Sequence, residues 1–448
     1  MVSNDHPQEQ PLKQLPVIIA GGGPCGLTAA LNFQQHGIPY CIIERASREK
    51  LCSNAGSGID VAPSAVSVLE SLQVDMDKAI QPYEYMYIAD MKGKHIKTYD
   101  LHNMKFGGTT RNFGFANRSN LQNALLDKIM DGKTMEEQEA VLKCGITVTG
   151  YENAADHVKV MLSDGSNIKG AALLACDGIH SGVRKHMHRN VNDDLNYCGQ
   201  ECWWGKIVVE PESEISQELK SLNKSEGMGD GNVSLAFMGT PQSPGGFFSC
   251  EIDNTHAWVY FVKNKDPAQA NQSNDLTRRG GCVLSEKDKQ EELEKAIANC
   301  HPIMQSIIRS TPASDITKAG LFDRKNLDLP FVDGRVGLLG DAAHPQSPMQ
   351  GQGANMAIVD GYVVSCLLAA AKMDNIGEAL QSYDTQSRRE GINKVIKEAR
   401  SYGRIAATKS RWKIWAVTAF LKYAPNKTVM TEMVKSDKSN QEFMEAML

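Results

Sequence analysis

The stretch Val17-Ile18-Ile19-Ala20-Gly21-Gly22-Gly23-Pro24-Cys25-Gly26 decides the fold class. Its first four residues are apolar and typical of a short buried strand, and the residues Leu27 to Gln35 after the glycines are expected to form a helix. A second strand is expected over Tyr40 to Ile43, ending at Glu44. A glycine loop between a strand and a helix, followed by a second strand, predicts a Rossmann-like turn that binds a dinucleotide.

Each position of this loop has a physical task. Gly21 permits the tight turn, Gly23 lets the backbone approach a pyrophosphate, and Gly26 lets the helix and strand pack closely. The helix N-terminus offers unpaired N–H groups and a positive dipole end to the phosphates. Glu44 is placed to accept hydrogen bonds from ribose hydroxyls and would repel a 2′-phosphate, which disfavours NADP at this site. The alternative is a glycine-rich turn that holds no ligand.

Two later signatures extend the expected site. Asp177-Gly178, at the end of an expected strand, is followed by a segment that runs to Arg184. Gly340-Asp341-Ala342-Ala343-His344-Pro345 also follows an expected strand and leads to a long helix that starts at Gly353 to Asn355. Asp341 would accept from a ribityl or ribose hydroxyl, and the helix N-terminus would stabilise the negative charge of a reduced flavin. The three signatures together predict a pocket for a dinucleotide with a flavin at its far end.

The composition is that of a globular enzyme. A chain of 448 residues with 41% hydrophobic and 23% charged residues is expected to form two packed domains. A net charge of −5 gives no basic field for nucleic acid. The odd number of 11 cysteines suits a reducing compartment, so we expect a cytoplasmic protein. The Cys198 and Cys202 pair has no second pair or histidine cluster at metal spacing, and His186 and His188 would point to different faces of a helix, so no metal is expected.

No membrane-spanning segment is expected. The polar N-terminus lacks a secretory signal, and no apolar run approaches the ~20 residues that a spanning helix needs. The segment Arg411 to Tyr423 is basic and aromatic. Such a helix can lie on a membrane surface, although packing against the cofactor domain is the commoner arrangement.

The ordered set of motifs resembles the class A FAD-dependent monooxygenases of the para-hydroxybenzoate hydroxylase fold, most closely the salicylate hydroxylase-like branch, over Pro16 to Arg388. The resemblance implies an α/β protein (α+β overall). It would have a Rossmann-like FAD-binding domain with a parallel sheet, a substrate domain with a mixed or antiparallel sheet, and C-terminal helices. The expected divisions are a disordered N-terminus (1–11), a discontinuous FAD domain (12–80, 105–190 and 320–375), a substrate domain (81–104 and 191–319) and a helical region (376–448).

The resemblance also implies the residues that bind the cofactor. Glu44 would bind the adenosine ribose, Asp341 the ribityl chain, and Ala354 with Asn355 the flavin ring, while His344 would line the flavin face. The complete cofactor-binding set that we expect is Gly21, Gly23, Pro24, Cys25, Gly26, Glu44, Arg45, Ser57, Arg118, Asp177, Asp341, Pro348, Gly353, Ala354 and Asn355.

The implied activity is the insertion of one oxygen atom of O2 into an aromatic or other electron-rich small molecule. NADPH or NADH would bind transiently and reduce FAD, and O2 would then form a flavin C4a-hydroperoxide. The choice between NADH and NADPH, and between a monomer and a homodimer, stays open. A substrate phenol would need a base, for which His256, Lys206 and Tyr260 are candidates. Side chains alternate between the two faces of a strand, so each of the three is more often structural.

Three other functions are alternatives for a sequence with these motifs. An alkene or isoprenoid epoxidase with the same cofactor remains open. A halogenase is rejected, because Trp203 and Trp204 are adjacent rather than alternate and no proline follows Ile207. A non-catalytic carrier that binds prenyl groups or flavin is the third alternative, and the intact segment from Asp341 to Asn355 argues against it.

Overall fold

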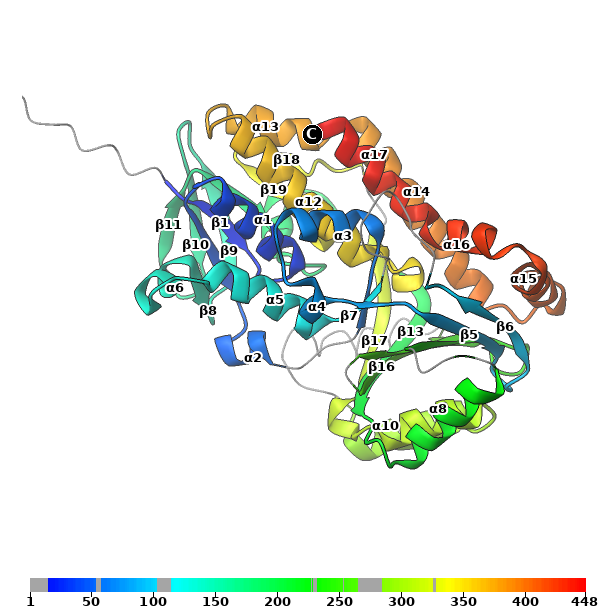
Figure 1. The fold of residues 1–448 in the computed structure, drawn as a ribbon. Helices are drawn as coiled ribbons and strands as arrows, with labels where there is room; N and C mark the ends of the chain where they lie inside the picture. Colours follow the sequence, from blue (N-terminus) through cyan, green and yellow to red (C-terminus); the bar gives the residue numbers. More distant parts are fainter. Residues whose placement is uncertain are drawn as a thin grey trace, which may run out of the picture.

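The computed structural model describes residues 15–53, 58–102, 114–226, 228, 232–252, 254–264, 284–324 and 328–448. The expected disorder of residues 1–11 and the cofactor role of Ser57 therefore lie outside the described residues. Two large sheets organise the rest, with one domain at the upper left of Figure 1 and the other at the lower right. A pocket between the two domains is lined by residues of the three sequence signatures, including Gly23, Asp177 and Asp341.

The first sheet carries the glycine loop and has the order β18-β19-β12-β1-β2-β8. Its central strand β1 is parallel to both neighbours and wholly buried, which agrees with its unbroken apolar sequence. The sheet is parallel except for the edge strand β18, which confirms the expected Rossmann-like architecture. Its strands are β1 (Val17–Ala20), β2 (Tyr40–Glu44), β8 (Leu142–Cys144), β12 (Ala172–Ala175), β18 (Val332–Asp333) and β19 (Val336–Leu338).

Helices α1 (Pro24–Gln35) and α12 (Gln352–Ala370) pack against each other beside this sheet. Helix α1 begins three residues before the expected Leu27, because Pro24 has the fixed φ of a first helical turn and needs no N–H there. The two helices approach closely at Gly361, where an added Cβ would lie 2.4 Å from the carbonyl oxygen of Cys25.

Helix α12 corrects one expectation about membranes. By length and composition it is the single described helix that could cross a membrane. More than half of its apolar window is buried inside the protein, and its buried residues belong to the core around β1. The expectation that no apolar run approached this length missed α12, because Asn355 and Asp360 interrupt its apolar sequence.

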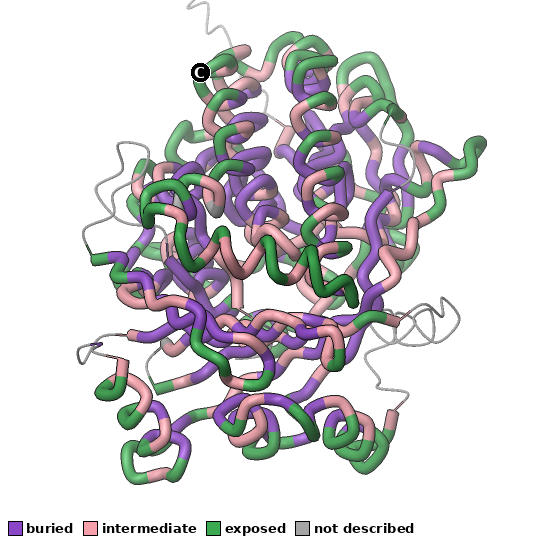
Figure 2. Tube along the Cα trace, turned by 90° about the vertical axis from the view of Figure 1, so that its right-hand side faces the viewer, coloured by how far each residue is buried: buried purple, intermediate pink, exposed green. Residues whose placement is uncertain are grey.

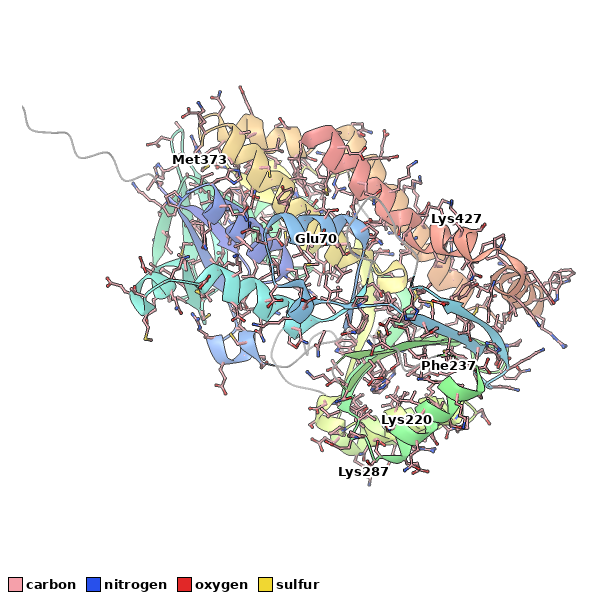
Figure 3. The ribbon with its side chains drawn as sticks, in the orientation of Figure 1. Glu70, Lys220, Phe237, Lys287, Met373 and Lys427 are labelled. Atoms are coloured by element: carbon pink, nitrogen blue, oxygen red, sulfur yellow. The ribbon has the colours of Figure 1, made fainter. Side chains whose placement is uncertain are left out.

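The second sheet has the order β17-β13-β16-β15-β14-β5-β6 and is antiparallel except between β14 and β5. Helices α8, α10 and α11 cover one face, and Phe237 of β14 belongs to the apolar core between that face and the helices (Figure 3). Strand β17 extends past residue 319, where the substrate domain was expected to end. The strands are β5 (Tyr85–Asp90), β6 (His95–Asp100), β13 (Leu195–Val208), β14 (Val233–Met238), β15 (Gly245–Ile252), β16 (Thr255–Lys263) and β17 (Thr317–Arg324); the helices are α8 (Glu214–Ser225), α10 (Glu286–Ile297) and α11 (Pro302–Ser310).

The C-terminal helices run along the outside of both domains (Figures 1 and 2). We expected helix α15 to pack on the FAD domain, but it packs on strand β6 of the second sheet. The Tyr99 hydroxyl donates to the Leu421 carbonyl (2.6 Å), and Lys97 Nζ donates to the Ala424 carbonyl (3.0 Å). The chain then returns to the first domain, where Asp437 accepts from the Ser64 backbone N–H (2.9 Å). These helices are α13 (Ile376–Tyr383), α14 (Gln386–Ala406), α15 (Arg411–Tyr423), α16 (Asn426–Val434) and α17 (Lys438–Met447).

Shorter elements complete the described fold. One antiparallel sheet, β11-β10-β9, flanks the first domain, and another, β3-β7-β4, lies between the two large sheets. The remaining elements are α2 (Arg48–Cys52), β3 (Gly58–Val61), α3 (Pro63–Ser71), α4 (Met76–Ala79), β4 (Gln81–Pro82), β7 (Gly114–Asn117), α5 (Arg118–Met130), α6 (Met135–Val141), β9 (Val148–Asn153), β10 (Val158–Leu162), β11 (Asn167–Gly170) and α7 (Gly182–Met187).

Candidate functional site

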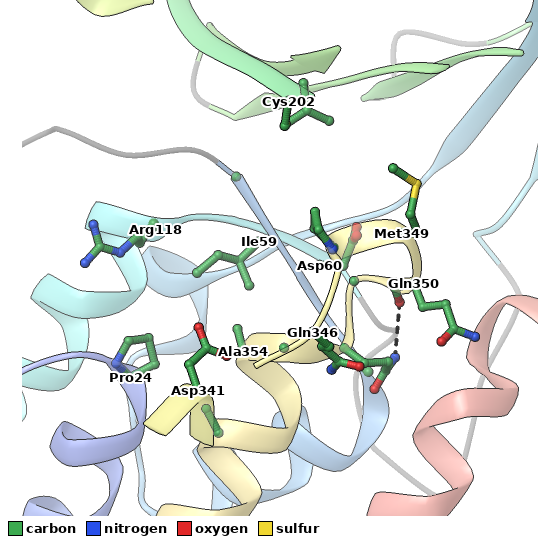
Figure 4. A pocket seen from close by; sticks show the side chains of 18 of the residues that line it. Pro24, Ile59, Asp60, Arg118, Cys202, Asp341, Gln346, Met349, Gln350 and Ala354 are labelled. Carbon is green, nitrogen blue, oxygen red and sulfur yellow. Dashed lines mark hydrogen bonds between the residues drawn. The ribbon is translucent and has the colours of Figure 1, made fainter. Parts of the chain in front are cut away.

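A single large pocket of about 1300 Å³ joins the two domains. One end is formed by the glycine loop, Glu44 and Arg118, and the middle by Asp341 and the start of α12. Figure 4 shows Cys202 above this middle part, projecting from the second sheet, while Asp341 and Ala354 lie below it. The far end is apolar and is lined by Trp204, Phe248, Ala257, Val259, Phe261 and Leu321 of the second sheet together with residues of α15 and α16.

The glycine loop leaves room for a diphosphate at one position. A Cβ at Gly23 would meet no atom within 4 Å, so this part of the backbone lies bare against the pocket. In contrast, a Cβ at Gly21 would lie 2.3 Å from the Cys176 carbonyl oxygen, and a Cβ at Gly26 would lie 2.1 Å from the Gly21 carbonyl oxygen. Gly26 therefore serves helix packing, as its position in the loop suggested, and is not among the residues that line the pocket.

Glu44 is held in place at this end of the pocket. Its Oε2 accepts from the Gly22 N–H and its Oε1 from the Ala46 N–H, both at 2.7 Å. Each carboxylate oxygen keeps a lone pair that a ribose hydroxyl could use. Arg45 and Arg118 line the same end, which gives it the positive charge that phosphates need.

Two aspartates, Asp177 and Asp341, present carboxylate oxygens to the pocket. Asp177 Oδ2 accepts from the Gly182 N–H (2.8 Å), but Asp177 Oδ1 is buried without a hydrogen-bond partner among the described residues. Burial raises the pKa of the carboxyls of both Asp177 and Asp341. Buried acceptors are normally satisfied, so the unpartnered Asp177 Oδ1 fits a hydroxyl donor of a ligand. Asp341 is exposed to the pocket, where its carboxylate can accept from the hydroxyl groups of a ribose or ribityl chain such as those of FAD.

The buried Arg184 joins the middle signature to the late one. Its Nη1 donates to the carbonyls of Ala342 (3.1 Å) and Ala343 (2.6 Å), and its Nε donates to Asp193 Oδ2 (2.6 Å). The guanidinium thereby fixes the chain on either side of the pocket. Strands β12 and β19 are parallel neighbours, which brings the two signatures to one site, and the Arg184 hydrogen bonds join them there.

A second buried cluster corrects the expectation that His344 lines the flavin face. Its Nε2 lies 2.6 Å from Asp360 Oδ2, beneath the loop, and the side chain is 1% exposed. Asp360 also accepts from the Gly340 N–H (2.9 Å) and from Arg388 Nη2 (2.6 Å). Burial by itself raises the pKa of the Asp360 carboxyl, but the charges of His344 and Arg388 hold it well below its ordinary value. The cluster anchors the strand end that carries Asp341.

The start of α12 faces the pocket through its backbone. Gly351 has a φ of +63°, and Gly353 and Ala354 line the pocket. Asn355, expected to contact the flavin ring, is completely buried. Its Oδ1 accepts from the Ala62 N–H (2.8 Å), and its Nδ2 donates to the carbonyls of Asp60 (2.9 Å) and Gly351 (2.7 Å). The Asn355 side chain therefore positions the loop instead of touching the pocket.

Two of the three candidate catalytic side chains lie on the wrong face of the second sheet. Tyr260 belongs to the core between the sheet and its covering helices, and its hydroxyl donates to the Ala296 carbonyl (3.4 Å). His256, 1% exposed, lies 3.4 Å from Glu251 and is four residues before Tyr260 on β16, so the two side chains lie on the same face of the sheet. Lys206 pairs with the pocket-lining Ala257, but the structure does not place Lys206 itself among the described lining residues. Burial lowers its pKa.

An acidic side chain that the sequence did not predict lies inside the pocket. Asp60 and Tyr83 both line it, and the Tyr83 hydroxyl donates to Asp60 Oδ1. Burial raises the pKa of the Asp60 carboxyl, while the bond from Tyr83 lowers it. The sequence carries a weak signal, since Asp60 closely follows the glycine loop that ends at Gly58, but an aspartate near a glycine is common in connectors.

Of the expected cofactor-binding set, the described pocket lining contains Gly21, Gly23, Pro24, Cys25, Glu44, Arg45, Arg118, Asp177, Asp341, Pro348, Gly353 and Ala354. Cys25 touches Cys176, and this contact and burial raise the pKa of its thiol. The roles of these residues in binding FAD stay predictions.

Residues 14–399 match the protein family described as FAD binding domain, and the chain belongs to that family. Two similar relatives are the 2-heptyl-3-hydroxy-4(1H)-quinolone synthase of Pseudomonas aeruginosa (27% identity, covering 92% of this chain and 94% of the relative) and the 3-hydroxybenzoate 6-hydroxylase 1 of Aquipseudomonas alcaligenes (27%, covering 82% and 84%). The resemblance to class A flavin monooxygenases is thereby confirmed, and the chain is a FAD-dependent monooxygenase.

Solved structures agree on the fold. Klebsiella pneumoniae HpxO complexed with FAD and uric acid superposes with a TM-score of 0.75 at 21% identity, covering 95% of this chain and 97% of HpxO. A salicylate hydroxylase substrate complex superposes with a TM-score of 0.68 at 19% identity, covering 96% and 98%.

Proposed function

We propose that this monooxygenase uses NADH or NADPH and O2 to hydroxylate an aromatic compound that carries a sizeable apolar portion and no carboxylate. The observation that carries the proposal is the continuity of the pocket, which leads from the FAD end directly to the apolar face of the second sheet. Pockets for drug-sized ligands hold about 300–1,000 Å³, so this one has room for the cofactor and a substrate together.

The charges in the pocket favour a substrate without a carboxylate. Among the described lining residues, the two arginines, Arg45 and Arg118, lie at the dinucleotide end. The described substrate end offers the acidic Asp60 and Glu432 instead, among aromatic and aliphatic side chains such as Phe248 and Phe261. An anionic substrate would be desolvated there without a cationic partner, which costs several kcal/mol for an unpaired ion (order of magnitude).

The names of the relatives support an aromatic substrate. One relative is a synthase of an alkylated hydroxyquinolone, and the other is a hydroxylase of hydroxybenzoate. The first of these compounds is neutral and carries a heptyl chain, and the substrate end of this pocket suits that chemistry better than the second.

The bound flavin would supply reduction by the nicotinamide nucleotide and activation of O2. The chain's own residues would hold and orient it: Gly23 against the pyrophosphate, Asp341 at the ribityl hydroxyls, and the N–H groups at the start of α12 near the flavin ring. The apolar walls would exclude water, which protects a reactive oxygen species from unproductive decay.

The Asp60 and Tyr83 pair would handle the proton of a ring hydroxyl or ring N–H. The pair lies beside the flavin end, since Gly351 approaches Asp60 so closely that an added Cβ would lie 2.4 Å from its Oδ2. A carboxyl whose pKa is raised by burial is a stronger base at neutral pH than an ordinary one. Tyr83 would orient it and relay the proton.

The test begins with the absorption spectrum of the purified protein and anaerobic reduction by NADH and by NADPH. Each of a set of aromatic compounds is then added: 4-quinolones with increasing alkyl chains, and hydroxybenzoates as carboxylate-bearing controls. We expect flavin reduction and O2 consumption to rise with chain length, and product analysis to show a new ring hydroxyl rather than an epoxide. Equal stimulation by hydroxybenzoates, or none by any neutral aromatic, would refute the substrate class.

A further inference from the structure

Helix α15 exposes an aromatic stripe in which the Trp412 and Trp415 rings pack edge to face on each other and Lys422 lies over Tyr423. Trp412 is 72% exposed, Trp415 61% and Tyr423 76%, among the most exposed large apolar side chains of the protein. At 3.6 residues per turn these three fall within an arc of about 80° on one side of the helix. No residue of α15 is buried, so the helix lies on the surface along its whole length (Figure 2).

The surroundings of the stripe are strongly basic. Between Glu398 and Glu432 the sequence contains seven lysines and arginines and no acidic residue, although the whole chain has a net charge of −5. On the helical wheel Arg411 and Lys422 flank one edge of the stripe and Lys413 lies past the other. Lys427 extends from the adjacent α16 into solvent (Figure 3).

The same helix forms part of the pocket wall. Ala416, Val417, Phe420 and Leu421 line the apolar end, and Phe420 is also 43% exposed, so it stands at the opening. The hydrogen bond from Tyr99 and the one from Lys97 hold the backbone of α15 on the edge strand β6. The side of α15 that faces β6 and the pocket is therefore held in place, while the aromatic stripe on the other side of the helix faces solvent.

We propose that α15 docks on an anionic membrane surface through Trp412, Trp415 and Tyr423, with the flanking lysines and arginines on the lipid headgroups. Tryptophan and tyrosine prefer the boundary between headgroups and acyl chains, and basic residues beside them add attraction to anionic lipids. Docking would place the apolar opening at Phe420 next to the bilayer. A substrate dissolved in the membrane would then enter directly, a consequence that rests on the proposed function.

A second copy of the chain is the other occupant to consider. A symmetric dimer through this face would bring Arg411, Lys413 and Lys422 of both copies together, with no acid of the segment to compensate. Like charges would oppose that contact, whereas a negatively charged bilayer is attracted by them. The charge pattern therefore favours the membrane.

The test is co-sedimentation of the full FAD-loaded chain with phosphatidylcholine vesicles, with and without about one-quarter phosphatidylglycerol. We expect binding to the anionic vesicles that weakens as salt rises, because exposed charges are screened. The double variant W412A/W415A should bind at least about tenfold more weakly, since both side chains leave the interface. The double reversal R411E/K413E should weaken binding to a similar extent.

Two controls keep the result specific. The variant M135A removes a 78% exposed apolar side chain on α6, and K220E/K287E reverses two charges on the helices that cover the other face of the second sheet (Figure 3). Both should bind like the unaltered chain. The proposal is overturned if the unaltered chain does not sediment with anionic vesicles, or if W412A/W415A binds as well as it does. A dimer in sedimentation velocity that W412A/W415A converts to a monomer would also overturn it. Because no substrate is present, the result is independent of the proposed activity.

Discussion

Asp360 offers the sharpest test of how the pocket is held together. Its carboxylate is 0% exposed and takes hydrogen bonds from Gly340, His344 and Arg388. The Nε and Nη1 of Arg388 have no hydrogen-bond partner among the described residues, so Asp360 is the main compensation for a buried cation. In Asp360→Asn one partner of the ion pair is removed and the guanidinium stays buried.

The expected loss is about 3–5 kcal/mol, the usual cost of breaking a buried ion pair. This is a large part of the about 5–15 kcal/mol that stabilises a typical domain. At roughly 2–4 °C for each kcal/mol, the melting temperature should fall by about 10 °C. Replacing both charges, as in D360N/R388M, should recover part of the loss, because no buried charge is then left alone.

The assay is thermal unfolding of the FAD-loaded protein across pH, with Asp374→Asn, in the exposed segment that follows α12, as the matched control. The folded-state pKa of Asp360 is lowered, so its contribution is present above the ordinary carboxyl pKa of about 3.9 and is lost as the pH falls through the folded value. The difference between the variant and the unaltered chain should therefore be largest near neutral pH and shrink under acid. A melting temperature within about 2 °C of the unaltered chain at neutral pH would refute this reasoning.

Three further predictions concern the pocket itself. Asp341→Ala should lower FAD affinity about 10- to 100-fold through the loss of a charge-assisted hydrogen bond, measured as flavin content after gel filtration; full flavin occupancy would contradict the assignment. Gly23→Ala should weaken FAD binding but leave the thermal stability of the FAD-free protein unchanged, because the added Cβ meets open space. Gly21→Ala should destabilise even the FAD-free protein, because Gly21 has a φ of +108° and an added Cβ would lie 2.3 Å from the Cys176 carbonyl oxygen. Tyr83→Phe and Asp60→Asn should each slow turnover by about 10²-fold. Asp60→Asn should also remove the titration on the acid side of the pH profile of kcat. An unchanged pH profile would exclude the pair as the group that handles the proton.

The sequence by itself determined the cofactor end of this protein. Glu44 is the last residue of a buried strand, and the glycine loop, Asp177 and Asp341 each come shortly after one. The ends of parallel strands meet at one edge of a sheet. Local order along the chain was therefore enough to predict that these residues converge. The expected strand, loop and helix were found with only small shifts at their ends, as for α1 and Pro24.

Only the tertiary structure decided the substrate end. His256 and Tyr260 lie on a strand whose side chains alternate between two faces, and the sequence shows this alternation. Which face is covered depends on where α8, α10 and α11 pack, and the local sequence pattern does not contain that information. Asn355 and His344 lie within the predicted motif, yet their side chains are turned to Ala62 and Asp360 by long-range hydrogen bonds. The wall formed by α15 depends on contacts with β6 more than 300 residues earlier in the chain, which sequence periodicity cannot encode because it reports only neighbours on the same element.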